Sequence, residues 1–202
     1  MPLIRGRYPL SNPVQALFGQ MANVVNASRP CRSNVEYFGI GNPSDGALAA
    51  TGVGCAVPIP WEPGDVVSKI RIMIGATAES GGSHAFAAVY SGIATPALIG
   101  QTTDQTGAAA AGASAVFDMT MATAAQITPA QCPNGFIYVS ISFTATVPTA
   151  ASMAIPTAVG YQWTTNGPLF LSATHGSSLG GTAAATIASP AAKAVAPIVI
   201  VT

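Results

Sequence analysis

Residues 61–90 read WEPGDVVSKIRIMIGATAESGGSHAFAAVY, and this stretch decides the fold class. From Lys69 to Ile74, isoleucine alternates with Lys, Arg and Met. A period of two predicts a strand with one buried and one exposed face. Residues 77–83 contain a Gly-Gly pair among small polar side chains, which favours a hairpin or a loop. A second strand is predicted over 84–90, so the stretch is typical of an antiparallel sheet.

The clearest alternation elsewhere lies in residues 136–147, FIYVSISFTATV. One face of this predicted strand is apolar and is expected to form the core: Ile137, Val139, Ile141, Phe143 and Ala145. The opposite face is expected to be exposed, and it carries Phe136, Tyr138, Ser140, Ser142 and Thr144. Because the side chains of a strand alternate between its faces, this register assigns every position at once.

Several shorter strands are predicted between turn signals, over residues 97–102, 114–121, 169–171 and 195–202. Pro58 and Pro60 lack a backbone N–H, so the segment that holds them is predicted to be an edge strand. Beyond residue 33 no helical pattern occurs. We therefore predict an all-β fold, an antiparallel β-sandwich or jelly roll, with a short N-terminal arm containing a helix.

The composition indicates that this chain is a subunit of a larger assembly. Charged residues make up 7% of the 202 residues, against roughly 25% in ordinary soluble domains. Residues 119–192 contain no Asp, Glu, Lys or Arg. No apolar run approaches the roughly 18 residues of a spanning helix, so we predict no membrane insertion. A surface with little charge does not keep copies apart. We predict a homo-oligomer built permanently into a larger particle.

The first 33 residues differ from the remainder. Four arginines precede the first acid, Glu36, and apolar residues after Pro13 follow helical spacing. An amphipathic helix of this length has no core of its own. We predict that residues 1–33 form an anchoring arm and residues 34–202 a β-sandwich domain; a solvated basic terminus is the alternative. The predicted docking residues are Arg5, Arg7, Leu17, Phe18, Met21, Arg29 and Arg32.

Catalytic patterns are weak. His84 and His175 have no nucleophile elbow or metal-ligand spacing nearby, so both are interpreted as structural. Asp104 and Asp118 are candidates for an acid/base pair if they meet in space. The sequence predicts no enzyme, no cofactor and no metal. The cysteines, Cys31, Cys55 and Cys132, are expected to be buried free thiols, with one disulfide left open.

Nucleic-acid binding and glycan binding depend on different residue types in this sequence. Four arginines on one arm are too few for a phosphate footprint, so no nucleic-acid partner is predicted. Aromatic residues suit either a core or a platform for sugar rings: Trp61, Tyr90, Tyr138, Tyr161 and Trp163. The best glycan-contact candidates lie in one loop-like stretch and are Tyr161, Trp163 and Asn166.

Three segments resemble a known module. Val89-Tyr90-Ser91 followed by residues 98–105, LIGQTTDQ, resembles an "LYS…LLAQTADQ" hairpin, and residues 135–139, GFIYV, resemble a "GxYYVxLxx" strand. Both patterns are typical of β-sandwich modules in tail-fibre and minor tail proteins of tailed bacteriophages, chiefly those of actinobacteria. The resemblance spans about 57–202. It implies a β-sandwich and a trimer, because fibre and capsid positions commonly have threefold symmetry, and it brings no catalytic residues.

The resemblance and the composition together lead to one expected function. We expect a tail-fibre or minor tail subunit of a bacteriophage virion, assembled in the bacterial host cytoplasm, that docks through its arm on other virion proteins and contacts a host-surface glycan. One alternative is a capsid decoration or head-fibre protein bound to capsomers. The other is a secreted glycan-binding lectin or glycan-acting enzyme.

Overall fold

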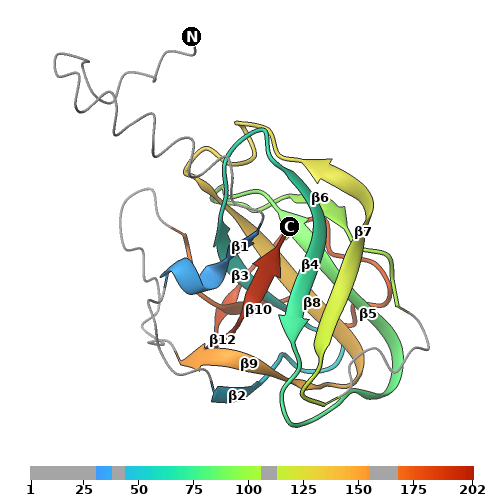
Figure 1. Ribbon diagram of the computed structural model, residues 1–202. Coiled ribbons are helices and arrows are strands. Elements are labelled where there is room, and N and C mark those ends of the chain that lie inside the picture. Colours follow the sequence, from blue (N-terminus) through green and yellow to red (C-terminus); the bar gives the residue numbers. More distant parts are fainter. Residues whose placement is uncertain (1–30, 38–43, 106–112, 155–167) are drawn as a thin grey trace, which may run out of the picture. The chain divides into compact units, whose positions relative to one another are not determined.

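The computed structural model describes residues 31–37, 44–105, 113–154 and 168–202 (Figure 1). Within them, residues 32–202 form one compact unit of antiparallel strands with a single turn of 3₁₀ helix, η1. The predicted all-β antiparallel sandwich is therefore confirmed, and the predicted arm helix lies outside the described residues. The elements are β1 (Arg32–Ser33), η1 (Asn34–Tyr37), β2 (Ser44–Ala47), β3 (Gly54–Pro60), β4 (Val66–Met73), β5 (Ser80–Tyr90), β6 (Leu98–Gln101), β7 (Val116–Gln126), β8 (Phe136–Thr146), β9 (Thr149–Ala154), β10 (Ala173–His175), β11 (Ala191–Ala192), β12 (Val195–Pro197) and β13 (Val199–Val201).

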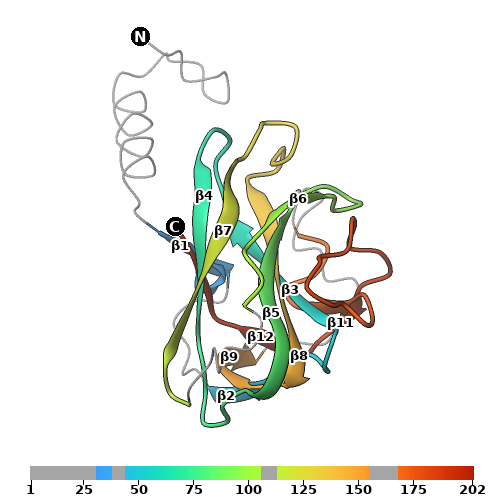
Figure 2. The same ribbon diagram turned by 90° about the vertical axis from the view of Figure 1, so that its right-hand side faces the viewer.

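Two main sheets form the layers of the sandwich. A four-stranded sheet has the order β1-β13-β4-β7, and a six-stranded sheet has the order β11-β10-β3-β8-β5-β6. A smaller sheet, β12-β9-β2, lies at one end. Figure 2 shows β4 and β7 in one layer and β5, β8 and β3 in the other, with the orange-to-red segment that includes β11 on the far side of the second layer. The C-terminal strand, β13, pairs with β4 in the first layer.

The main core fills the space between the two layers. β4 contributes Val67, Ile70 and Ile72, and β8 contributes the face that begins at Ile137. Phe143 is 2% exposed, and its ring centroid lies 6.0 Å from that of Phe117 on β7. Alternation along each strand sends every second side chain into this core. The predicted core face of residues 136–147 is confirmed.

A second core covers the outer face of the six-stranded sheet. Residues 168–192, which we call the C-terminal cap, contribute Phe170, Ala183 and Ile187 to it. Beneath them lie Tyr90 and Tyr138, at most 1% exposed. The expectation that the second face of β8 is exposed is therefore wrong: its residues Phe136, Tyr138, Ser140 and Ser142 are all buried. The small side chains of the cap allow the backbone to approach the sheet closely.

The predicted hairpin over residues 61–90 does not form. β4 pairs with β7 and β13, whereas β5 pairs with β8 and β6 in the other sheet. The glycine-rich link therefore crosses between the layers. The physical reason lies in burial: β5 is buried on both faces from Ala85 to Tyr90, so it requires a sheet that is covered on both sides. β4 buries one face only.

Three shorter predictions need correction. β3 is an inner strand, but its pairing with β10 ends at Ala56, so Pro58 and Pro60 do lie on a locally unpaired edge. The last predicted strand is two strands, β12 and β13, which belong to different sheets and break at Ile198. Residues 169–171 are bent chain without strand pairing, because Phe170 and Leu171 are buried as single side chains in the cap.

Candidate functional site

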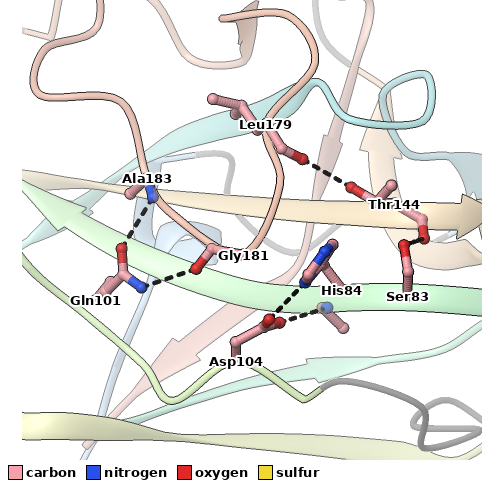
Figure 3. A network of polar contacts seen from close by, with 9 residues as sticks. Ser83, His84, Gln101, Asp104, Thr144, Leu179, Gly181 and Ala183 are labelled. Carbon is pink, nitrogen blue, oxygen red and sulfur yellow. Dashed lines mark hydrogen bonds and ion pairs between the residues drawn. The ribbon is translucent and has the colours of Figure 1, made fainter.

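A polar network fastens the C-terminal cap to the six-stranded sheet, and it begins with His84 and Asp104 (Figure 3). His84 lies on β5, and its Nδ1 is 2.6 Å from Oδ2 of Asp104, which follows β6. The second carboxylate oxygen of Asp104 accepts the backbone N–H of Ala85 at 3.1 Å. The carboxylate therefore fixes both the ring and the backbone of β5.

The other half of the network forms hydrogen bonds with the backbone of the cap. The side-chain amide of Gln101 donates to the carbonyl of Gly181 at 3.1 Å and accepts the N–H of Ala183 at 2.9 Å. The hydroxyl of Thr144 donates to the carbonyl of Leu179 at 2.7 Å. Because these cap residues belong to no strand, side chains of the sheet satisfy backbone groups that a ladder would otherwise satisfy. We call the four side chains of His84, Gln101, Asp104 and Thr144 the latch.

Gly181 allows the cap to pass directly above the latch. A Cβ at this position would lie 2.3 Å from Oδ2 of Asp104 and 3.0 Å from Nδ1 of His84. A triad for acyl transfer would need a hydroxyl or thiol on the second ring nitrogen of His84. The neighbouring hydroxyl, on Ser83, instead donates to the carbonyl of Thr144 at 3.1 Å. The arrangement orients an imidazole and holds a loop.

The second histidine, at the end of β10 within the cap, lies in the interior. His175 is 4% exposed, its Nε2 is 2.7 Å from the hydroxyl of Ser140, and its ring meets that of Tyr90 edge to face at 5.6 Å. Its Nδ1 is buried without a hydrogen-bond partner. Burial lowers the pKa of His175 to about 4, so the ring is neutral at pH 7. The structural interpretation of both histidines agrees with this geometry.

Arg32 belongs to the sandwich. Its side chain is 7% exposed, forms ion pairs with Asp65 and Glu62, and lies over Trp61 with Cζ 5.1 Å from the ring centroid. Asn34, fully buried, accepts the N–H of Val199 and donates to the carbonyl of Pro197. These contacts hold the start of the domain against the C-terminal strands. Arg32 therefore has a structural task in the sandwich, and the other predicted docking residues lie in residues 1–31, which we call the leader.

The remaining sequence candidates separate into buried and undescribed residues. Trp61, Tyr90 and Tyr138 are at most 4% exposed, so they belong to the core and not to a sugar platform. Burial raises the pKa of Tyr138 to about 12. Some candidates lie outside the described residues: Tyr161, Trp163 and Asn166 for glycan contact, and Arg5, Arg7, Leu17, Phe18, Met21 and Arg29 for docking.

The two acids considered as a pair have separate partners. Asp104 belongs to the latch, whereas Asp118 on β7 accepts from Arg71 at 2.5 Å and 2.8 Å and from Lys69 at 3.3 Å. The hydrogen bond from Arg71 is the main reason that the pKa of Asp118 is lowered to about 2. Each carboxylate is therefore committed to a local cation or imidazole, which leaves the acid/base hypothesis without support.

All three cysteines are free. Cys55 and Cys132 are buried as expected, and burial raises the pKa of Cys132 to about 11. Cys31 is exposed, which corrects the expectation of three buried thiols. It precedes β1, where the chain has not yet entered a sheet.

Sequence reasoning missed Gln101 and Thr144 as latch residues. For Gln101, the available signal was the polar run at the end of a short strand, residues 98–105, LIGQTTDQ, because such side chains often form hydrogen bonds with a neighbouring loop. Within the described ranges, no three His, Cys, Asp or Glu side chains gather as metal ligands. The part of the chain that the structure describes also contains no helix long and apolar enough to cross a membrane. Comparison with known protein families and with curated proteins found no match for this chain.

Removing the Gln101 amide is expected to loosen the cap locally. Gln101→Ala deletes two hydrogen bonds to cap backbone, each worth about 1 kcal/mol net, so amide exchange at Leu179 and Ala183 should accelerate by about tenfold or more. Gln126→Ala is the matched control, because Gln126 is exposed on β7. Equal exchange rates in the two variants would contradict the latch.

Proposed function

We propose that this chain is a structural subunit of a bacteriophage virion, a tail-fibre or minor tail protein that docks on other virion proteins through residues 1–31. Its role in this proposal is architectural and not enzymatic. The partners proposed are neighbouring virion proteins, copies of the chain itself and a glycan on the host surface. The subunit would be built into the particle in the cytoplasm of the bacterial host.

One observation carries the proposal: the three segments that resemble the phage module lie side by side and have structural tasks. They fall on β5, on β6 with the turn that follows, and on β8, in the spatial order β8-β5-β6. Tyr90 and Tyr138 fill the second core, and the hydroxyl of Tyr90 donates to the carbonyl of Ala184 at 3.0 Å. Gln101 and Asp104 form half of the latch. The residues that carry the resemblance thus lie on neighbouring strands and belong to the second core or to the latch.

The distribution of charge also supports a docked subunit. Residues 1–31 carry three arginines and no acid. The remainder carries four basic and seven acidic residues, giving 4 − 7 = −3. A basic segment on a weakly acidic body is suited to an acidic docking surface. The low overall charge suits permanent assembly, because it provides little repulsion between subunits.

The test is incorporation into particles. Deleting residues 2–31 retains β1, Asn34 and the Arg32 contacts, so the truncated protein should keep the melting temperature of the full chain. It should be missing from particles purified from infected cells in which it replaces the full chain. Normal incorporation of a folded, truncated protein would contradict docking through residues 1–31.

Imaging of particles that carry a label on the C-terminal residue locates the subunit. A label on the tail supports the proposal, and a label on capsomers replaces it with capsid decoration. The predicted trimer is checked on the purified chain by mass measurement at micromolar concentration. The 20.1 kDa chain should then appear at three times its own mass.

A further inference from the structure

The four-stranded sheet leaves one face without a cover from the described residues, and an apolar pair stands on it. Met73 is 53% exposed and Val116 is 55% exposed, and the two are cross-strand partners on β4 and β7. With Val66, they are the exposed large hydrophobic residues of the described ranges. The six-stranded sheet, by contrast, has its outer face covered by the C-terminal cap. The exposed apolar pair therefore marks a surface suited to contact.

A surface depression of about 270 Å³ adjoins this pair. Its walls come from β2, the end of β4, the link after β4, the turn before β7, and β9. Its lining residues are Ser44, Asp45, Met73, Ile74, Gly75, Ala76, Ser114 and Ala151. Most of the wall is apolar or backbone. Asp45 is the one carboxylate in this lining.

Asp45 differs from the other acids for which the structure shows a partner. Asp65, Asp104 and Asp118 each contact a basic or imidazole side chain. Asp45 has a backbone partner: its Oδ2 accepts the N–H of Ala76 at 3.2 Å. No Lys, Arg or His of the described ranges lies within ion-pair distance of it. An exposed carboxylate beside an apolar wall thus retains accepting capacity for a cation.

The glycine at position 75 holds this carboxylate in place. A Cβ at Gly75 would lie 1.7 Å from Oδ1 of Asp45, so only glycine allows the acid to lie against the link. Two cations of the described ranges bear on this site. Lys193 donates from Nζ to the carbonyl of Ala47 at 2.6 Å, two residues along β2 from Asp45, and is held there by the backbone. Arg71 is bonded to Asp118 and lies four positions before Gly75, or roughly 13 Å along a strand, which exceeds the screening length of about 8 Å at physiological salt, so it repels an incoming cation only weakly.

The chemistry of the depression fits an arginine side chain. A guanidinium binds a carboxylate through two parallel N–H bonds, and its aliphatic stem packs on apolar surface such as Met73. The same chain supplies such side chains in residues 1–31, whose charge of +3 balances the charge of −3 on residues 32–202. Residues 1–31 and residues 32–202 are thus complementary in charge, so a second copy of the chain can supply the occupant.

We propose that the depression at Asp45 binds the arginine-bearing leader, residues 1–31, of a second copy of this chain. The contact is head to tail, since it joins the leader of one copy to the sandwich of the next. Such contacts generate a closed ring when the rotation between copies allows it, as the predicted trimer requires. The inference rests on the docking role of residues 1–31 in the proposed function, but it names the chain itself as the partner.

The test uses the purified full-length chain under reducing conditions, which keep the exposed Cys31 from cross-linking copies. Sedimentation measurements should show that the wild type self-associates, and that this association weakens as the salt concentration is raised. Asp45→Asn should weaken this association by about tenfold or more, because it removes the negative charge. Gly75→Ala should also weaken it, because the added Cβ displaces the carboxylate of Asp45. Glu62→Gln is the charge-matched control at a half-exposed position outside the depression. It removes one of the two ion-pair partners of Arg32, the other being Asp65, so its melting temperature is measured alongside, and it should leave association unchanged.

A mixing experiment establishes that the contact runs between copies. A leader variant has Arg5, Arg7 and Arg29 replaced by Gln, and a site variant carries Asp45→Asn. Each should be monomeric alone. Mixed together they should form a one-to-one complex, because the site variant supplies an intact leader and the leader variant supplies an intact depression.

Three results would overturn the inference. They are a wild type that remains monomeric at the micromolar concentration of the mass measurement, self-association that Asp45→Asn leaves unchanged, and a mixture of the two variants that forms no complex. These results are separate from particle incorporation. If the chain joins particles through residues 1–31 but fails the mixing experiment, the virion role stands and this inference falls. If mixing succeeds but the truncated chain is incorporated normally, the docking role falls.

Discussion

Replacing Phe143 by Ala should lower the free energy of unfolding by about 3–5 kcal/mol. The side chain is 2% exposed between the two sheets and packs against Phe117. The whole stability of a domain is about 5–15 kcal/mol, so this one change removes a large fraction of it. Urea unfolding of the purified variant measures the loss. A soluble Phe143→Leu variant, which retains most of the volume, keeps the comparison possible if the alanine variant does not fold.

Ser142→Ala is the neighbouring control, on the opposite face of β8. Ser142 is also 2% exposed, but its hydroxyl has no hydrogen-bond partner. Removing a buried, unsatisfied hydroxyl relieves a desolvation cost, so stability should stay within roughly 0.5 kcal/mol or increase slightly. Equal losses at the two positions would mean that the register of β8 is wrong.

Acidification from pH 6.5 to pH 4 should weaken the fold through His175. The pKa of the ring in the folded chain is lowered by burial to about 4, from 6.5 for an accessible histidine. Between these values the unfolded chain binds the proton and the folded chain does not, so stability falls as the pH falls. The loss reaches about 3 kcal/mol at pH 4. Tyr90, in ring contact with His175, stays neutral because burial raises its pKa to about 12.

The matched variant is His175→Gln, which keeps a polar side chain near Ser140 but does not titrate. Urea midpoints at pH 7, pH 5.5 and pH 4.5 should fall steeply in the wild type and much less in the variant. Asp118 does not interfere, because its pKa of about 2 places the loss of its ion pairs below this window. Parallel pH profiles in the two proteins would refute the assignment to His175.

The strands and one side of the core could be predicted from local pattern. The alternation of residues 136–147 correctly placed Ile137, Val139, Ile141 and Phe143 in the core. A strand with period-two alternation has little freedom to choose another buried face, since a one-residue slip would expose the whole set. The fold class followed from repeating that pattern between turns.

The partners of each strand could not be predicted in this way. The pattern of residues 61–90 is compatible with a hairpin, yet β4 and β5 belong to opposite sheets. Hydrogen-bond capacity is the same on every strand edge, so sequence proximity alone does not select the pairing. The selection depends on which faces other segments cover, which is a property of the whole chain.

For the candidate site, the sequence shows which polar residues are available but not which backbone groups they contact. Asp104 and Gln101 were visible as polar residues after a short strand, but Gly181, Ala183 and Leu179 lie about 80 residues further along the chain. Arg32 was predicted to be a docking residue because it is one of four arginines that precede the first acid, whereas its burial depends on contacts with Trp61 and Asp65.

By itself, the sequence determined that this chain forms an antiparallel β-sandwich with little surface charge, because periodicity and composition are local quantities. Only the tertiary structure decided that the second face of β8 is also a core. The cap that buries this face is rich in small residues without periodicity, so no local sequence pattern predicts that it packs there. Contacts across long sequence separations, such as the 35 residues between Ser140 and His175, decide whether a polar side chain is exposed or becomes part of the interior.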